Sequence, residues 1–250
     1  ADMLAALNGF ERQQLDAYAV RSQQLAAHAS QAGYFNKSLV PVRDVNGLTV
    51  LDHDEYIRGD TSMQSMAALK PAFGGASAAA NQAVARQRYP QLDQIPAVHT
   101  AGSSSGIVDG ASLVLVGNAQ VERELGLRPR ARILGTGLST VDPTLMLTGP
   151  VSATQKALAK ANLDVAQIDL FEVNEAFAAV PLYFVKELNV SLDKINVNGG
   201  SIAMGHPIGA TGAMILGTLL DELERRQLRY GVATLCVAGG MGVATVIERI

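Results

Sequence analysis

The chain has 250 residues, of which 48% are hydrophobic and 17% are charged, and its formal net charge is −3. This composition predicts a globular protein with a substantial core, in one large domain or two smaller ones. The 20 basic residues are spread along the chain, which argues against a nucleic-acid-binding surface. No apolar run is long enough to span a bilayer, no signal-peptide pattern opens the chain, and the single cysteine fits a reducing compartment. We therefore expect a cytoplasmic protein.

The first hundred residues predict one helix followed by largely irregular structure. Residues 10–31 place apolar side chains at helical spacing among charged ones, which predicts an exposed amphipathic helix. The dipeptide Asn46-Gly47 between two short apolar runs is typical of a β-hairpin. Residues 62–105 are rich in Ala, Gly and Ser and lack periodicity, so we expect irregular, ligand-facing structure there. The small hydroxyl residues at 100–106 could bind an amide-bearing ligand or simply cap a helix.

Strand and helix signals alternate after Pro129. The expected strands cover residues 132–137, 168–173, 194–197, 231–238 and 242–250, and the expected helices cover residues 152–162, 174–188 and 210–226. Such alternation predicts an α/β layered domain in which the last two strands are neighbours. The boundary with the irregular first part is expected near residues 106–130.

A glycine-rich loop at residues 196–212 contains a histidine and a proline between a short β-type run and a helical one. Glycine allows close backbone approach, and Pro207 stiffens the turn next to His206. An imidazole held at the start of a helix, with backbone N–H groups nearby, suits a general base or an oxyanion donor. A surface turn that happens to contain a histidine is the alternative.

Two further loops follow expected strands. Asn174 opens the helix after its strand, so it is either a ligand-facing amide or a helix N-cap. Cys236 ends a strand before a glycine-rich turn whose backbone N–H groups could stabilise an oxyanion, although a lone strand cysteine is often an inert hydrophobic residue. In α/β sheets, ligands bind where such loops gather. Taken alone, Cys236, His206 and Asn174 predict a thiol nucleophile, its base and an orienting amide, as in a cysteine acyltransferase or hydrolase.

Three motifs occur in one order along the second half of the chain. They are Asn174-Glu-Ala-Phe-Ala, Asn198-Gly-Gly-Ser-Ile-Ala-Met-Gly-His-Pro-Ile-Gly-Ala-Thr-Gly and Cys236-Val-Ala-Gly-Gly-Met-Gly. This set resembles the signature motifs of thiolases, the acetyl-CoA acyltransferases. The run Leu51-Asp-His-Asp-Glu-Tyr-Ile-Arg is most similar to bacterial thiolases of fatty-acid β-oxidation, including thiolase subunits of a trifunctional complex. The resemblance implies a thiolase-like layered α/β fold.

The resemblance also implies a role for each site residue. Cys236 would carry a proton to and from the α-carbon of the acetyl-CoA unit, whereas His206 would activate a different cysteine and help to bind the thioester oxygen. Asn174 would hold a water that completes this oxyanion hole, and the backbone at Ala238 and Gly239 would face a second oxyanion site in the acyl pocket. The residues that would contact CoA are Arg58, Ser65, Phe73, Ser105 and Phe177. CoA would be a cosubstrate, and no metal or prosthetic group is implied.

Two features depart from the family pattern. Ala238 stands where many thiolases have glycine, so a methyl group would project near the acyl site. The nucleophilic cysteine of thiolases lies in their N-terminal half, and this chain contains only Cys236. We therefore expect the N-terminal half to be missing, with residues 1–106 forming the loop domain that covers CoA. Residues 107–128 would be the remainder of the N-terminal domain, and residues 129–250 the C-terminal domain.

The expected activity is CoA-dependent cleavage of 3-oxoacyl-CoA to acetyl-CoA and a shortened acyl-CoA, or the reverse Claisen condensation. The expected partners are acyl-CoA and CoA, an N-terminal thiolase fragment or chain, further copies in a homo-oligomer, and a β-oxidation hydratase/dehydrogenase subunit. One alternative is a non-catalytic half-thiolase that binds CoA or supports assembly. Another is a stand-alone cysteine hydrolase in which Cys236 is the nucleophile.

Overall fold

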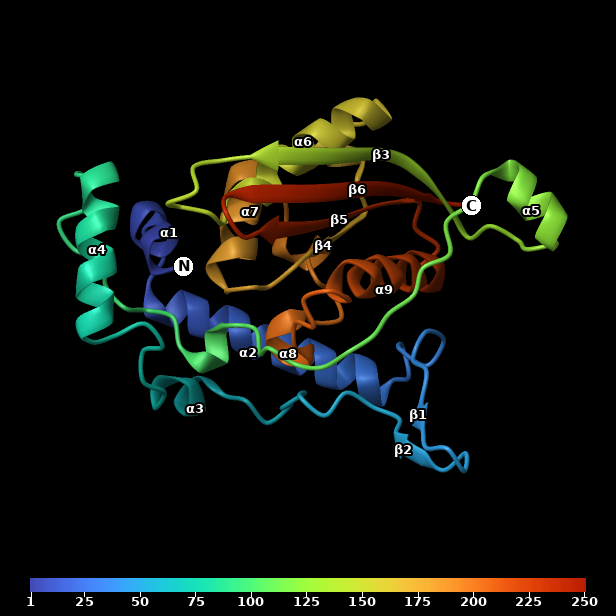
Figure 1. Cartoon of the computed structure of the whole chain (residues 1–250), viewed down its shortest axis with the longest axis horizontal. Coiled ribbons are helices and arrows are strands. Elements are labelled where there is room, and N and C mark those ends of the chain that lie inside the picture. Colours follow the sequence, from blue (N-terminus) through green and yellow to red (C-terminus); the bar gives the residue numbers. More distant parts are fainter.

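A four-stranded mixed sheet with the strand order β3-β6-β5-β4 lies at the centre of the computed structural model (Figure 1). The structure describes the backbone of residues 1–250 and all side chains except those of residues 76, 77 and 81. The strands are β3 (Ala131–Thr140), β4 (Leu170–Val173), β5 (Tyr230–Val237) and β6 (Met241–Arg249). β6 is antiparallel to β3 and β5, whereas β4 is parallel to β5. The predicted adjacency of the last two strands is confirmed.

The turn between β5 and β6 depends on its glycines. Gly239 and Gly240 have φ angles of 85° and 84°, in the left-handed region that favours glycine. A Cβ at Gly240 would lie 2.7 Å from the carbonyl oxygen of Val141, which is closer than any side chain tolerates. The N–H of Val141 donates to the carbonyl oxygen of Gly240 at 2.7 Å. The turn is therefore held against the chain that leaves β3.

Helices cover both faces of the sheet. α6 (Gly149–Ala161) and α7 (Ala179–Leu188) lie on one face, and α9 (Thr211–Arg225) lies on the other. Successive residues of β5 belong to different apolar layers, because Val232 packs with α6 and α7 whereas Ala233 packs with α9. The predicted α/β layered class is confirmed, and α6 and α9 lie close to their expected positions.

The helix after β4 begins later than predicted. Residues 174–178 are irregular, and Phe177 forms an isolated bridge with Ser104. α7 begins at Ala179, which places Pro181 in the first turn, where its missing N–H group costs no helical hydrogen bond. The prediction of a helix from residue 174 is therefore wrong.

The N-terminal helices belong to the core. α1 (Asp2–Asn8) precedes α2 (Arg12–Gln31), and Leu15 and Tyr18 of α2 are buried in the larger apolar cluster. Figure 1 shows α2, in blue, passing below the sheet beside α8 (Ser201–Met204). The predicted helix is present, but only one of its faces is exposed. Gln13, Gln14 and Gln24 face water, whereas polar groups of the other face bind inside the fold, as the Tyr18 hydroxyl does by donating to a buried carboxylate.

The region predicted to be irregular, residues 62–105, contains two helices. They are α3 (Met63–Ala67) and α4 (Ala76–Arg88). Alanine has the highest helix propensity, so the alanine content of this stretch was a helical signal despite the missing periodicity. The predicted hairpin is confirmed as β1 (Val42–Arg43) and β2 (Thr49–Leu51), with Gly47 at a φ of 83°.

A strand was also predicted at residues 194–197 but does not form. Ile195 makes only an isolated parallel bridge with Phe171, next to a short 3-10 turn. The 3-10 turns are η1 (Ala101–Ser103), η2 (Val165–Gln167) and η3 (Leu192–Lys194). The glycine-rich loop therefore follows a single bridged residue and not a full strand.

Residues 107–118 contain no regular element, and α5 (Ala119–Leu125) follows them. Several of their apolar side chains face solvent, including Ile107 at 87% and Leu113 at 94% exposure. In the part of the chain that the structure describes, no helix is both long and apolar enough to cross a membrane. The domain boundaries at residues 106 and 128 stay a prediction.

Candidate active site

His206 lies in a loop that is held from two sides. Its backbone N–H donates to the carbonyl oxygen of Gly106 at 2.8 Å. The preceding Gly205 has a φ of 86°, and a Cβ there would lie 2.4 Å from Cγ2 of Val108. Only glycine fits this position without displacing a neighbour. The loop therefore fixes His206 between the segment after Gly106 and the start of α9.

Both nitrogens of the His206 ring have partners. Nδ1 lies 2.6 Å from Oγ1 of Thr211, whose hydroxyl also lies 2.9 Å from the carbonyl oxygen of Pro207. Nε2 lies 3.2 Å from Nδ2 of Asn174. Burial lowers the pKa of His206 below its usual value, because the charged imidazolium loses hydration. The ring is therefore a neutral base at neutral pH.

Asn174 lies directly after β4 and extends its pairing with β5. Its backbone N–H donates to the carbonyl oxygen of Thr234 at 2.9 Å, and its side chain is 1% exposed. The Ser201 hydroxyl donates to Asn174 Oδ1 at 2.5 Å, which turns Nδ2 towards His206. Because α7 begins at Ala179, Asn174 is not the N-cap that one reading of the sequence expected.

Cys236 lies on β5, two residues beyond Thr234, whose carbonyl oxygen accepts the hydrogen bond from the Asn174 N–H. β4 and β5 are parallel and Val173 pairs with Thr234, so Asn174 and Cys236 lie at the same end of adjacent strands. Burial raises the pKa of the Cys236 thiol to about 11, because the thiolate would lose hydration. The sulfur is therefore protonated at neutral pH. Among the described side chains, Cys236 forms no hydrogen bond with His206 or Asn174.

Ala238 and Gly239 occupy the turn after Cys236. Both residues are exposed, and nothing lies within 4 Å of the position that a Cβ at Gly239 would take. The turn therefore borders open space at the same sheet end as Cys236, as expected for the rim of an acyl pocket. Its role as an oxyanion site stays a prediction.

Three of the five expected CoA residues lie beside this sheet end. The hydroxyl and the N–H of Ser105 donate to the carbonyl oxygen of Ala176, at 3.2 and 3.1 Å. The ring of Phe177 makes edge contacts with Phe73 and His99, at centroid distances of 5.7 and 5.6 Å. These contacts join Phe73, His99 and Ser105 to the segment that begins at Asn174.

Arg58 and Ser65 have other surroundings. The Arg58 guanidinium lies over the ring of Tyr56, 5.3 Å from its centroid. Gly106 packs against Tyr56, and a Cβ at that glycine would meet the Tyr56 Oη at 2.5 Å. Arg58 thus lies near the segment that holds His206. The exposed Ser65 caps α3 together with Ser62, and the described contacts do not connect it with the other site residues.

Glu175, which the sequence analysis did not single out, has a buried carboxylate that connects several elements next to the site. Oε1 of Glu175 accepts hydrogen bonds from the Tyr18 hydroxyl at 2.7 Å and from Asn196 Nδ2 at 2.9 Å. Oε2 accepts from the Ser22 hydroxyl at 2.7 Å and from the Ile202 N–H at 3.0 Å. Glu175 thereby joins α2, the glycine-rich loop and α8. The only sequence signal for this role was that Glu175 follows Asn174, a candidate catalytic residue. The hydrogen-bond partners Tyr18 and Ser22 lie more than 150 positions away in sequence.

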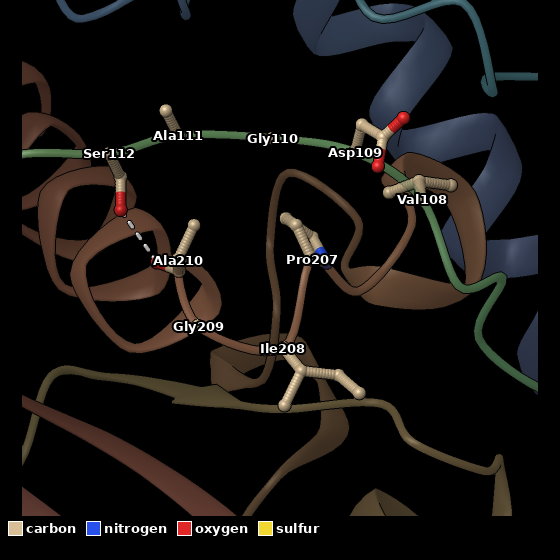
Figure 2. A pocket seen from close by; sticks show the side chains of 9 residues that line it. All are labelled: Val108, Asp109, Gly110, Ala111, Ser112, Pro207, Ile208, Gly209 and Ala210. Atoms are coloured by element: carbon tan, nitrogen blue, oxygen red, sulfur yellow. Dashed lines mark hydrogen bonds between the residues drawn. The ribbon is translucent and has the colours of Figure 1, made fainter.

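Figure 2 shows a hollow that opens beside the His206 loop, where residues 108–112 cross residues 207–210. Its volume is about 400 Å³. The Ser112 hydroxyl donates to the carbonyl oxygen of Ala210 at 2.6 Å. A Cβ at Gly110 would lie 2.8 Å from Cγ of Pro207, so the segment passes directly over the proline. In the part of the chain with described side chains, no cluster of three or more His, Cys, Asp or Glu could hold a metal ion.

Two family models match the chain. One, described as the thiolase C-terminal domain, matches residues 127–249, and the other, described as the thiolase N-terminal domain, matches residues 1–85. The chain belongs to the thiolase family. The resemblance carried by the three motifs is thereby confirmed.

Individual thiolases agree with this assignment. A 3-ketoacyl-CoA thiolase of Aliivibrio fischeri is 43% identical over 255 residues, and an acetyl-CoA acetyltransferase of Chromobacterium violaceum is 45% identical over 252 residues. The crystal structure of the Bacillus anthracis acetyl-CoA acetyltransferase is 38% identical with a TM-score of 0.87. That of human mitochondrial 3-ketoacyl-CoA thiolase in complex with CoA is 34% identical with a TM-score of 0.84. All four matches cover 100% of this chain.

The chain spans only part of these thiolases, namely 61% and 59% of the two curated relatives and 59% and 57% of the two solved chains. The expectation that the N-terminal half is missing is nevertheless not borne out. The N-terminal-domain model matches residues 1–85, and α1 and α2 from that stretch contribute to the core.

Proposed function

We propose that this chain contributes the acid–base centre of a thiolase. The reaction is CoA-dependent cleavage of 3-oxoacyl-CoA to acetyl-CoA and a shortened acyl-CoA, or the reverse Claisen condensation. One observation carries the proposal. A neutral His206 ring with an amide on Nε2 lies at the sheet end where Cys236 presents a protonated thiol.

The chemistry needs two thiols in different protonation states. In the cleavage direction a thiolate attacks C3 of the substrate, and the C2–C3 bond breaks with its electron pair on C2. The Cys236 thiol gives its proton to C2, which yields acetyl-CoA and leaves the acyl group on the attacking sulfur. The CoA thiol then transfers its proton to the Cys236 thiolate and attacks the acyl thioester. Shortened acyl-CoA leaves, and the attacking sulfur is restored as a thiolate.

His206 and Asn174 serve the attacking thiol in this scheme. Nε2 of His206 takes the proton from that thiol, and the resulting imidazolium donates to the oxygen that becomes negative. Asn174 Nδ2 lies 3.2 Å from Nε2, close enough to hold a water at the same oxygen. The chain has a single cysteine, so the attacking thiol comes from outside these 250 residues.

The exposed apolar residues of segment 107–116 support a protein partner beside the site. Leu113, Leu115 and Val116 are 94%, 69% and 65% exposed. Several exposed apolar residues within one short segment are typical of an interaction site. The occupant we propose is the polypeptide that supplies the attacking thiol. A homo-oligomer, a β-oxidation hydratase/dehydrogenase partner and a cytoplasmic location stay predictions.

The raised pKa of Cys236 counts against a stand-alone cysteine hydrolase, because a nucleophilic cysteine needs a lowered pKa. The complete hydrogen-bonded arrangement of His206, Asn174 and Ser201 counts against a purely structural half-thiolase. We propose CoA as a cosubstrate, with Phe73, Ser105 and Phe177 as its nearest contacts, and no metal or prosthetic group.

The test measures CoA-dependent cleavage of acetoacetyl-CoA by the chain alone and by the chain mixed with a thiolase polypeptide that contains the nucleophilic cysteine. We expect turnover only in the mixture. Cys236→Ser and His206→Gln should each lower kcat by about 10²–10⁴-fold. His53→Gln is the matched control, because the side chain of His53 is 66% exposed and lies outside the site.

Three results would contradict the proposal. Robust turnover by the chain alone would show that Cys236 is the nucleophile. Full activity of Cys236→Ser in the mixture would remove its role in proton transfer. CoA binding without turnover in every mixture would favour the non-catalytic half-thiolase.

A further inference from the structure

The hydroxyl of Thr211 connects the His206 ring with the backbone of its own loop. Thr211 is the first residue of α9 and is 1% exposed. Its Oγ1 lies 2.6 Å from His206 Nδ1 and 2.9 Å from the carbonyl oxygen of Pro207. Both contacts are within hydrogen-bond distance, so this one hydroxyl has two partners.

The chemistry of the two partners determines where the protons lie. A carbonyl oxygen can only accept, so the single hydroxyl proton of Thr211 points to Pro207. The lone pairs of Oγ1 then face Nδ1 of His206, which must supply the proton of that contact. A neutral imidazole carries one N–H, so Nε2 is left with a free lone pair.

The Ser201 hydroxyl supports the same position of the proton, on Nδ1 of His206, through the contact at the other ring nitrogen. The Ser201 hydroxyl donates to Oδ1 of Asn174, so the amide presents its Nδ2 donor to His206 Nε2. A donor facing Nε2 requires a lone pair there. Ser201 and Thr211 are the first residues of α8 and α9, so two helix starts impose the same proton arrangement.

We propose that Thr211 is a positioning residue that holds His206 in the Nδ1–H tautomer, which leaves the basic lone pair on Nε2, beside Asn174 Nδ2. The consequence for catalysis rests on the proposed function, because only a thiolase-type reaction needs a base at Nε2. The tautomer itself depends only on the hydrogen bonds of the folded chain. The opposite tautomer would leave Nε2 unable to take a proton from a thiol.

The direct test is ¹⁵N NMR of the histidine side chains in the wild-type chain near neutral pH. The four histidines of the chain are distinguished by comparison with His206→Gln. We expect a pyrrole-type Nδ1 and a pyridine-type Nε2 for His206. In Thr211→Val, which keeps the side-chain shape and leaves the Asn174 donor at Nε2, we expect a smaller share of the Nδ1–H form than in the wild type. Thr211→Ser keeps the hydroxyl and should restore the wild-type pattern.

Kinetics of the same variants in the two-polypeptide mixture supply the second measurement. Thr211→Val should lower kcat by about 2–10-fold with KM within about threefold, because part of the His206 population then lacks a base at Nε2 and the ring is held less firmly. Thr211→Ser should recover most of this loss. If Thr211→Val does not fold, Thr211→Ala replaces it, and a thermal melt of each variant shows which protein is folded.

The outcomes separate this proposal from the proposed function. A pyridine-type Nδ1 in the wild-type chain, or an unchanged tautomer in a folded Thr211→Val, would overturn the role of Thr211. The expected tautomer shift without thiolysis in any mixture would support Thr211 and contradict the thiolase activity.

Discussion

Glu175 illustrates how much of the site depends on a residue with no part in the proposed chemistry. It is fully buried, and its oxygens accept from two hydroxyls, one amide and one backbone N–H. A buried carboxylate is tolerated only when such donors replace its hydration. Gly200 lies against it, and a Cβ at that position would meet Glu175 Cδ at 2.4 Å. The adjacent Asn174 has partners of its own, the carbonyl oxygen of Thr234 and the Ser201 hydroxyl.

The substitution Glu175→Gln should lower the free energy of unfolding by about 1–3 kcal/mol, because its NH₂ group would face donors that need an acceptor. Urea unfolding followed by circular dichroism measures this. Glu187→Gln is the control, because Glu187 is an exposed residue of α7 and should change stability by less than about 0.5 kcal/mol. Equal stability of the two variants would mean that the buried hydrogen bonds of Glu175 contribute nothing measurable.

The thiol of Cys236 should react slowly with iodoacetamide. Burial raises its pKa from 9.0 to about 11. The raised pKa leaves about a hundredfold less thiolate at pH 8 than in an unperturbed cysteine, and only the thiolate reacts. The rate, followed by intact mass, should rise as the pH approaches 11 and should match that of free cysteine in denaturant. Alkylation of the folded chain at the rate of free cysteine at pH 8 would contradict the raised pKa.

At the scale of elements, the glycine-rich loop is shaped by what packs on it. Gly199, with a φ of 78°, approaches the carbonyl oxygen of Ser22 in α2, and Gly205 approaches Val108. The loop therefore has contacts on two sides, and its glycines are needed where those contacts are tightest. This also explains why one face of α2 is buried, since Ser22 and Gln23 on that face bind Gly200 and Ile202.

The substitution Gly205→Ala should lower the free energy of unfolding by about 1–3 kcal/mol or more. The cost arises because alanine is strained at a φ of 86° and its Cβ would overlap Val108. The variant should also lose activity, because His206 is the next residue. Gly217→Ala is the matched control in α9, where nothing lies within 4 Å of the added Cβ. It should raise stability by about 0.5–1 kcal/mol. A thermal melt of both variants tests this, and equal changes would contradict the packing argument.

At the scale of the whole molecule, residues 107–116 border the candidate site and are largely exposed to solvent. Residues 107–116 lie over the His206 loop through Gly110 and Ser112, yet their larger apolar side chains face outwards. The same segment therefore contacts the His206 loop and offers an apolar surface. A partner bound there would be placed beside His206.

The substitutions Leu113→Asp and Leu115→Asp should weaken binding of the cysteine-bearing polypeptide by at least about tenfold. They should leave the stability of the chain within about 0.5 kcal/mol, because both side chains are mostly exposed, at 94% and 69%. Sedimentation of the mixture measures the binding. Val45→Asp, at a position that is 101% exposed on the hairpin, is the control. Unchanged binding by the Leu113 and Leu115 variants would place the partner elsewhere.

Local sequence by itself determined the strands β3, β5 and β6, the helices α6 and α9 and the hairpin, because periodicity and turn residues act over a few positions. The motifs also predicted His206, Asn174 and Cys236 as site residues, and the structure brings Asn174 to 3.2 Å from the His206 ring. Propensity and periodicity failed at the start of α7 and over residues 194–197, where contacts with Ser104 and Phe171 replaced local preference.

Only the tertiary structure decided that one face of α2 is buried, that Glu175 joins three elements, and that the Thr211 hydroxyl contacts both the His206 ring and the carbonyl oxygen of Pro207. The Tyr18 and Ser22 hydrogen bonds to Glu175 connect residues more than 150 positions apart. No local pattern encodes such pairs. A polar residue on a helix is predicted to face solvent unless its buried partner is already known. The physical reason is that burial and hydrogen bonding are properties of the packed molecule, whereas propensity is a property of neighbouring residues.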